Sequence, residues 1–354
     1  MAKFLYGVSG EGSGHSSRAK EVIENLIKQG HQVKVVSYGR GYKGLNRYFD
    51  VEEINGLHFS FKNNKIRYMG TLYKNLCRFP GLARSILRVV KNAKKFQPNI
   101  IFSDFEPISC IVANLLRIPL ISIDNQHRLT NTVIEVPRGH KPDAMIAKLV
   151  IKLMIFNPKA YLVTTFHHGG TADKKTFLFP PILRKEVLAL SALEKDFILV
   201  YVTSGFLGLI EILKKINAKF IVYGFDRREM DGNIEFKPFS QDGFLRDLAD
   251  CRAVAASAGF TLISEALHFG KPYLALPINS HFEQIFNAFI LEKLGYGKCQ
   301  KDISKEKIES FISNLDLYKK NLKQYPKEDN SGIFKKINEL IAKYKDEKDW
   351  GKKT

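Results

Sequence analysis

The sequence predicts an α/β fold made of two doubly wound domains that face each other across a cleft. Residues 3–37 have the pattern of a buried strand, a glycine-rich loop, an amphipathic helix and a second strand. The same alternation restarts at residue 197 and repeats over residues 253–277. Strands that alternate with helices in this way are typical of open parallel sheets with helices on both faces.

Length and composition agree with two intracellular domains. The chain has 354 residues, of which 45% are hydrophobic, enough for two packed cores. Its four cysteines are widely spaced and form no CxxC pair, which indicates neither a zinc site nor a disulfide framework. The N-terminus lacks a signal-peptide core, and no apolar run reaches the ~18 residues of a membrane span. We expect a cytoplasmic protein, either free or peripheral on the inner face of the membrane.

A proline-rich stretch marks the boundary between the two halves. Residues 179–184 read Phe-Pro-Pro-Ile-Leu-Arg, which is stiff and suits an interdomain hinge. We therefore predict a first domain over residues 1–180, a linker over 181–195 and a second domain over 196–330. A C-terminal helix with a lysine-rich tail follows over 331–354.

The first glycine-rich loop carries a histidine. It follows the strand Lys3–Val8 and precedes a helix predicted over Arg18–Gln29. It is not a dinucleotide fingerprint, because the second strand lacks the acidic residue that binds ribose, and it is not a P-loop, because no lysine follows the last glycine. It places His15 at the carboxyl edge of the sheet, where a histidine is a typical general base. A helix-capping role is the alternative.

Two later strands of this half end in polar clusters. The strand Asn99–Ser103 runs into Asp104, and the strand Ile118–Ile123 runs into Asp-Asn-Gln-His at 124–127. In an open parallel sheet these ends face the same crevice as His15. Asp104 could then orient the imidazole and stabilise its charge. Asp124 or His127 could do related work, and a turn or cap role is the alternative for each.

The net charge of +19 is unevenly distributed. No carboxylate occurs between Glu53 and Asp104, whereas ten lysines and arginines do, and four of them recur at helical spacing: Arg84, Arg88, Lys91 and Lys95. Such a basic amphipathic helix suits an anionic membrane surface or a phosphorylated partner, and an ordinary solvated face is the equal alternative. Nucleic-acid binding is not expected, because no recognition motif accompanies the charge.

A second apolar segment, Ala144–Phe156, is broken only by two lysines. It is too short to span a membrane. We expect a core helix here in preference to an interfacial one.

The second half contains the most informative stretch, residues 257–288. Ser257 and Gly259 precede a helix that should start near Phe260, and free N–H groups at a helix start favour an anion such as phosphate. Glu265 lies one turn after Thr261, where a carboxylate can accept hydrogen bonds from a ribose diol. The next loop carries His281, Glu283 and Gln284, which suit sugar hydroxyls. An ordinary α/β turn is the alternative.

Two motifs together resemble the GT-B glycosyltransferases. They are the loop that ends in Gly14-His15 and the run Ser-Ala-Gly-Phe-Thr-x-x-x-Glu-Ala-x-x-x-Gly-Lys-Pro at 257–272, followed by His-x-Glu-Gln-x-x-Asn-Ala at 281–288. The chain is most similar to family 28, which includes the lipid-linked N-acetylglucosaminyltransferase of peptidoglycan synthesis, and to uncharacterised archaeal and bacterial relatives. Where the peptidoglycan enzyme has His-Glu-Gln-Asn, this chain has Asp-Asn-Gln-His at 124–127.

The resemblance implies a Rossmann-like fold for both domains and assigns roles to individual residues. The N-terminal domain would bind the acceptor and the C-terminal domain a nucleotide sugar. His15 would be the base and Asp104 its partner. The donor residues would be Ser204, Gly205, Phe239, Ser257, Gly259, Phe260, Thr261, Glu265, Glu283 and Gln284. The acceptor residues would be Gly12, Gly14, Asp124, Asn125, Gln126 and His127.

The expected activity is inverting, metal-independent transfer of a hexose or N-acetylhexosamine from a UDP-sugar to a hydroxyl acceptor, for which a lipid-linked molecule is one candidate. The nucleotide sugar is a co-substrate, and we expect no cofactor. The chain has no Asp-x-Asp motif, in keeping with a metal-independent site. Two alternatives stay open: a sugar-nucleotide 2-epimerase of the same fold, and a non-catalytic nucleotide-sugar-binding protein.

Overall fold

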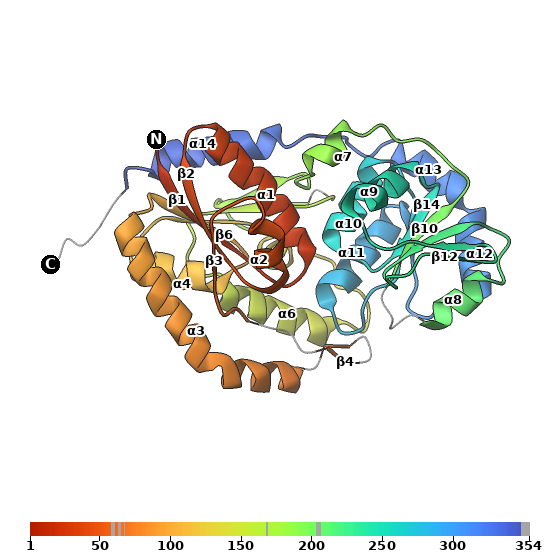
Figure 1. Cartoon of the computed structure of the whole chain (residues 1–354), viewed down its shortest axis with the longest axis horizontal. Helices are drawn as coiled ribbons and strands as arrows, with labels where there is room; N and C mark the ends of the chain where they lie inside the picture. Colours follow the sequence, from red (N-terminus) through yellow and green to blue (C-terminus); the bar gives the residue numbers. More distant parts are fainter. Residues whose placement is uncertain (58–60, 63–64, 67, 168, 203–206, 348–354) are drawn as a thin grey trace.

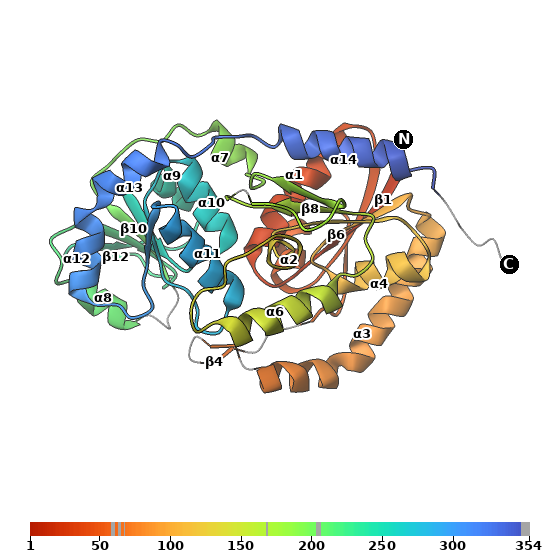
Figure 2. The same ribbon diagram turned by 180° about the vertical axis from the view of Figure 1, so that it is seen from behind.

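Two α/β domains lie side by side in a computed structural model of the chain (Figures 1 and 2). The structure describes residues 1–57, 61–62, 65–66, 68–167, 169–202 and 207–347. Each domain is built on a seven-stranded sheet, so the predicted fold class is confirmed.

The sheet of the first domain is parallel throughout. Its strands, in sheet order, are β3 (Val51–Glu53), β2 (Gln32–Ser37), β1 (Lys3–Val8), β6 (Ile100–Asp104), β7 (Leu120–Asp124), β8 (Ala160–Thr164) and β9 (Thr176–Phe179). Its helices are α1 (Ser13–Lys28), α2 (Gly39–Leu45), α3 (Tyr68–Phe96), α4 (Pro107–Leu115), α5 (Arg128–Asn131) and α6 (Lys141–Met154), and a hairpin of β4 (Phe61–Lys62) and β5 (Lys65–Ile66) precedes α3. The central strands β6 and β7 are buried along their whole length, which explains why their sequences are mostly apolar.

The second sheet has the same plan, with one antiparallel edge strand. Its order is β12 (Glu229–Asp231), β13 (Ile234–Phe236), β11 (Phe220–Tyr223), β10 (Ile198–Tyr201), β14 (Ala253–Ala256), β15 (Tyr273–Ala275) and β16 (Gly297–Cys299). The helices are α8 (Leu207–Leu213), α9 (Gln241–Asp250), α10 (Phe260–His268), α11 (Phe282–Lys293), α12 (Lys305–Ser313) and α13 (Leu315–Leu322).

The strand order determines where ligands can bind. In each sheet the connections change direction beside the first strand of the domain, between β1 and β6 and between β10 and β14. The crevice at the carboxyl ends of such a strand pair is the usual ligand site of doubly wound folds. The loop before α1 and the end of β6 meet at the first switch point, and the start of α10 lies at the second.

The chain crosses between the domains twice. The first crossing carries α7 (Lys185–Ala189), and the second leads to α14 (Ser331–Tyr344), which returns to the first domain (Figures 1 and 2). There the apolar side of α14 shares a core with α1 and the strands of the first sheet. Asn330 ties the two crossings together, because its side chain both accepts from and donates to the backbone of Leu183.

Helix α1 begins at Ser13, earlier than the predicted start at Arg18. Gly12 precedes it with φ of 97°, a left-handed conformation that glycine adopts without strain. The last part of the predicted loop is therefore the first turn of the helix, which fixes His15 on a rigid element.

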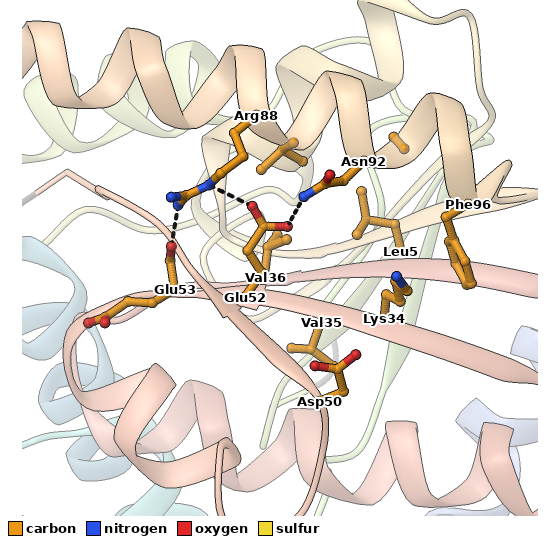
Figure 3. Close-up of a pocket in the computed structure, with 12 residues that line it drawn as sticks. Leu5, Lys34, Val35, Val36, Asp50, Glu52, Glu53, Arg88, Asn92 and Phe96 are labelled. Atoms are coloured by element: carbon orange, nitrogen blue, oxygen red, sulfur yellow. Dashed lines mark hydrogen bonds and ion pairs between the residues drawn. The ribbon is translucent and has the colours of Figure 1, made fainter.

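Helix α3 is a long basic helix whose predicted stripe is only partly free. Figure 3 shows Arg88 and Asn92 reaching down from α3 to the edge strand β3, beside a cavity of about 520 Å³. Arg88 Nε and Asn92 Nδ2 each donate to the carboxylate of Glu52, at 2.8 Å. One member of the basic stripe thus anchors the helix to the sheet.

Helix α6 is less buried than predicted. We predicted a core helix over Ala144–Phe156, but only one side of the helix is buried, through Ala144, Ile151 and Met154. Met145, Leu149 and Leu153 are 58–72% exposed. Among the described residues, no helix is both long enough and apolar enough to cross a bilayer.

Glu106 gives the fold a testable pH dependence. It is fully buried and caps α4 by accepting from the N–H groups of Ile108 and Ser109. Burial raises its pKa to about 7. Between its ordinary pKa and 7 the folded state binds more protons than the unfolded state, so its contribution to stability falls as pH rises through this window.

We expect the Glu106→Gln variant to lose this pH dependence, because it cannot ionise. Its free energy of unfolding should gain on the order of 3 kcal/mol relative to wild type between about pH 5 and pH 8, as measured by denaturant titration. The exposed Glu309→Gln substitution is the control and should change nothing. Parallel pH profiles for wild type and Glu106→Gln would contradict the assignment.

Candidate active site

A cavity of about 570 Å³ lies between the two domains and contains His15. The first domain contributes the loop before α1, Phe105, Gln126 and the inner face of α6. The second domain contributes the loop and helix start at 278–284, including Glu283 and Gln284. The predicted base and two predicted sugar-binding residues therefore line one space.

Asp104 holds the imidazole of His15. Asp104 is the last residue of β6, is completely buried, and lies with Oδ1 2.6 Å from His15 Nδ1. The structure thus brings together the two residues that the sequence predicts as a pair. When Nδ1–H donates to the carboxylate, the other ring nitrogen, Nε2, keeps its lone pair, which a general base needs.

Arg18, one turn along α1, completes this cluster. Its Nε and Nη2 donate to the two oxygens of Asp104 at 2.6 and 2.5 Å, and its Nη1 donates to Asn125 Oδ1 at 2.5 Å. Burial alone would lower the pKa of Arg18, but Asp104 raises it. The guanidinium therefore holds both carboxylate oxygens of Asp104 in place beside the imidazole.

Arg18 also competes for the imidazole. Its Nη2 lies 2.8 Å from His15 Nδ1, and a guanidinium can only donate. A bond from Arg18 to Nδ1 would require the proton to sit on Nε2, and the base would be lost. Asp104 Oδ1 lies closer to Nδ1 than Arg18 Nη2 does, and a negatively charged carboxylate can only accept a hydrogen bond. We therefore assign the tautomer with the proton on Nδ1.

A second histidine–carboxylate pair lies beneath the first. His127 Nδ1 is 2.7 Å from Asp124 Oδ2, and both side chains are at least 98% buried. Burial acts to raise the pKa of Asp124, but His127 and Ser122 together hold it at about 2. Neither His127 nor Asp124 lines the cavity, which favours His15 as the base.

The neighbouring amides reach across the domain boundary. Asn125 Nδ2 and Gln126 Nε2 donate to the two oxygens of Glu283, at 2.9 and 3.2 Å. Predicted acceptor residues are therefore in direct contact with a predicted donor residue. Gln284 turns back on its own loop, where its Oε1 accepts from the N–H of Ile278.

The start of α10 faces the start of α1. Gly259 caps α10 without a side-chain hydrogen bond, and no acidic residue occurs in the first turn. Gly14 packs directly against Thr261, whose hydroxyl would lie 2.4 Å from a Cβ at this position. A side chain at position 14 would therefore have to displace the Thr261 hydroxyl.

The predicted ribose ligand already has a protein partner. Both oxygens of Glu265 accept from Arg184, at 2.8 Å each, and the carboxylate is 97% buried. Burial raises the pKa of Glu265, while Arg184 opposes this shift. A ribose must use the remaining lone pairs of the carboxylate or displace Arg184, so ribose binding by Glu265 stays a prediction.

The other predicted donor residues are spread along the same edge of the second sheet. Phe239 is 53% exposed and contacts an aromatic cluster of Tyr201, Tyr223 and Phe244. Ser257 uses its carbonyl to accept from Tyr273, and Phe260 is buried. Ser204 and Gly205 lie outside the described residues. Within the described part of the chain, no cluster of three or more histidine, cysteine, aspartate or glutamate side chains could hold a metal.

Solved structures of other proteins have the same architecture. The glycosyltransferase of kitacinnamycin superimposes with a TM-score of 0.73 at 15% identity, covering 97% of this chain and 99% of its own. MurG of Acinetobacter baumannii superimposes with a TM-score of 0.62 at 16% identity, covering 97% and 100%. The fold is that of the GT-B glycosyltransferases.

Sequence relatives identify the family. Residues 2–316 match the family described as glycosyl transferase family 1, and the chain belongs to it. An uncharacterised glycosyltransferase of Methanosarcina acetivorans is 25% identical over 328 residues, covering 84% of this chain and 85% of the relative. A Bacillus cereus protein named as a UDP-N-acetylglucosamine–N-acetylmuramyl-(pentapeptide) pyrophosphoryl-undecaprenol N-acetylglucosamine transferase is 24% identical, covering 96% and 100%. The protein is a glycosyltransferase.

Three arginines lie at this interface that were not predicted as site residues: Arg18, Arg128 and Arg184. Arg18 lies three residues after His15, on the same face of α1. With the helix start at Ser13, this spacing would have predicted that Arg18 lies beside His15. Arg184 and Arg128 have no comparable signal, because their neighbours come from distant parts of the chain.

Replacing Asp104 by asparagine should stop glycosyl transfer in a protein that still folds, at reduced stability because buried Arg18 loses its anionic partner. The amide can donate to Nδ1 and so leave the proton on Nε2, and loss of the orienting carboxylate costs about 10⁴-fold in rate in histidine-based sites. Release of nucleoside diphosphate measures the rate, and thermal unfolding checks the fold. Asp124→Asn is the matched control in the second pair. A larger loss in Asp124→Asn than in Asp104→Asn would move the base to His127.

Proposed function

We propose that this glycosyltransferase is inverting and uses Nε2 of His15 as the base. The observation that carries the proposal is the position of His15, which lines the interdomain cavity while its Nδ1 is held by a fully buried carboxylate. The acceptor hydroxyl would lose its proton to Nε2 as its oxygen attacks the anomeric carbon, and the bond to the diphosphate breaks on the opposite side. One positioned base supplies about 10²–10⁴-fold in rate.

The start of α10 would receive the departing diphosphate. Its first N–H groups have no side-chain cap, and uncapped helix starts favour phosphate through their N–H groups and the helix dipole. This assignment needs no metal ligand. Charge that develops on the leaving group is then met by groups already in place, which is how an oxyanion site lowers a barrier.

The donor we propose is a UDP-linked hexose or N-acetylhexosamine. The printed name of the Bacillus cereus relative specifies a UDP-N-acetylglucosamine donor, whereas a structural neighbour, the glycosyltransferase VinC, was solved with dTDP. Glu283 and Gln284 line the cavity from the second domain and can accept from or donate to sugar hydroxyls. A screen with UDP, GDP and dTDP sugars separates these choices.

The bound donor should raise the apparent stability, by ~2.7 kcal/mol at a hundredfold excess over its dissociation constant. We expect Glu265→Ala to remove this thermal shift and His15→Ala to keep it while turnover stops. Arg184→Ala is the matched control, because it frees the same carboxylate and should leave the shift intact or larger.

Three results would count against parts of this proposal. Normal donor shifts in Glu265→Ala would contradict the ribose site. Full turnover in His15→Ala would contradict the base. Inversion at C2 of the sugar without any acceptor, in place of acceptor-dependent diphosphate release, would indicate an epimerase.

We further propose a lipid-linked acceptor presented from an anionic membrane. Helix α6 supports this because one side of it, through Ile146, Ala147 and Val150, lines the cavity, while the next side exposes Met145, Leu149 and Leu153. A lipid chain leaving the cavity would thus meet a continuous apolar surface. Exposed apolar area of this kind typically marks a contact surface.

Helix α3 extends this surface. It lies along the same edge of the first domain as α6 in both views (Figures 1 and 2). Tyr73, Leu76, Phe79 and Leu87 are 61–71% exposed on it, and its lysines and arginines have no carboxylate neighbours in the sequence from 54 to 103. Apolar insertion combined with basic charge is the pattern of interfacial helices.

The double substitution Leu76→Glu/Phe79→Glu should weaken binding to vesicles that contain phosphatidylglycerol by about tenfold or more, which corresponds to ~1.4 kcal/mol. Sedimentation with vesicles measures the bound fraction, and added salt should lower it. Leu317→Glu, at an exposed position on α13, is the control. Equal binding by the double variant, or equal binding to neutral vesicles, would contradict the membrane surface.

A further inference from the structure

Arg128 is a buried cation without an anionic partner among the described residues. It is the first residue of α5, directly after the Asp-Asn-Gln-His cluster, and is 6% exposed. Its Nη1 is buried without a hydrogen-bond partner in the described part of the chain. Arg18 and Arg184, at the same interface, are both paired with carboxylates, so Arg128 stands apart.

Arg128 spans the boundary between the domains. Its guanidinium lies 5.6 Å from the ring of Phe166 and 4.7 Å from the ring of Phe286, which belongs to α11 of the second domain. Phe166 in turn stacks on Phe260, the first residue of α10, at 5.7 Å. Phe166 therefore connects the cation to Phe260, the first residue of the helix to whose start we assign the diphosphate.

No anion among the described residues balances the positive charge of Arg128. Burial lowers the pKa of Arg128 to about 10, so the guanidinium stays charged at neutral pH. Contacts with aromatic faces offset only part of the cost of burying a cation. The uncapped start of α10 adds further positive potential. The guanidinium has no described anionic partner and the helix start has no side-chain cap, so each can still bind an anion.

We propose that Arg128 binds the diphosphate of the nucleotide-sugar donor from the side of the first domain. This deepens the proposed function and rests on it. A guanidinium offers paired N–H donors that match two phosphate oxygens, and the N–H groups of α10 would hold the same group from the second domain. The bound diphosphate would then bridge the two domains, and Arg128 would stabilise the negative charge that develops as the glycosidic bond breaks.

Arg128→Met provides the sharpest test, because it keeps the apolar packing against the two rings and removes the charge. Inorganic pyrophosphate serves as the probe, with its affinity measured by calorimetry on the full chain. We expect the variant to be at least as thermally stable as wild type without ligand, since an uncompensated charge is removed, and to bind pyrophosphate at least tenfold more weakly. Arg128→Lys should retain part of the affinity.

The control is Arg227→Met. Arg227 also lies over aromatic rings, with Phe236 at 4.0 Å, but it stands next to the edge strand of the second sheet and pairs with Glu229. Its replacement should leave pyrophosphate binding unchanged.

Unchanged affinity together with a lower melting temperature in Arg128→Met would show that Arg128 only holds the domains together, and would overturn the inference while leaving the helix-start site intact. If wild type bound neither pyrophosphate nor any nucleoside diphosphate, the donor site itself would be refuted, and the inference with it.

Discussion

The buried carboxylate of Asp104 organises the first domain's side of the active site. One oxygen lies against His15 Nδ1, both oxygens accept from Arg18, and the backbone carbonyl of the same residue accepts from the N–H of Ser9. A charge buried this deeply is tolerated only when its hydrogen bonds are satisfied. The cluster therefore fixes the start of α1 against the end of β6, and with it the loop that lines the cavity.

Several polar groups that we assign to substrates also hold the two domains together. Glu283 is held by Asn125 and Gln126 of the first domain, and Glu265 by Arg184 of the crossing segment. Thr261 packs against Gly14 of the first domain. On the proposed assignment, a donor that displaces these contacts exchanges them for its own, which couples donor binding energetically to the relative position of the domains. Such coupling is how a two-domain transferase can exclude water until both substrates are present.

Much of this arrangement could be predicted from the sequence. The alternation of strands and helices gave the two sheets, and the rule that carboxyl ends of parallel strands share one edge brought His15 to Asp104. The start of α10 was predicted near Phe260, where the helix begins. These features depend on local patterns and on a topological rule, which a single sequence contains.

Other features depend on contacts between distant segments and could not be predicted in this way. The pairing of Glu265 with Arg184 joins residues 81 positions apart, and nothing near Arg184 marks it as a partner. The apolar sequence of α6 fitted a core helix equally well, because burial is decided by the neighbours that cover a helix and not by its own composition. The start of α1 was predicted too late because Gly12 and Gly14 were both assigned to a loop. Gly14 lies within the helix, where it allows close packing against Thr261.

The central claim is that Asp104 keeps the proton of the neutral His15 imidazole on Nδ1 and leaves Nε2 free. Nitrogen-15 NMR of the histidine side chains, with His15 assigned through the His15→Ala spectrum, measures this directly. The account predicts a protonated Nδ1 and an unprotonated Nε2. A neutral imidazole with its proton on Nε2, and with Nδ1 accepting from Arg18, would contradict it.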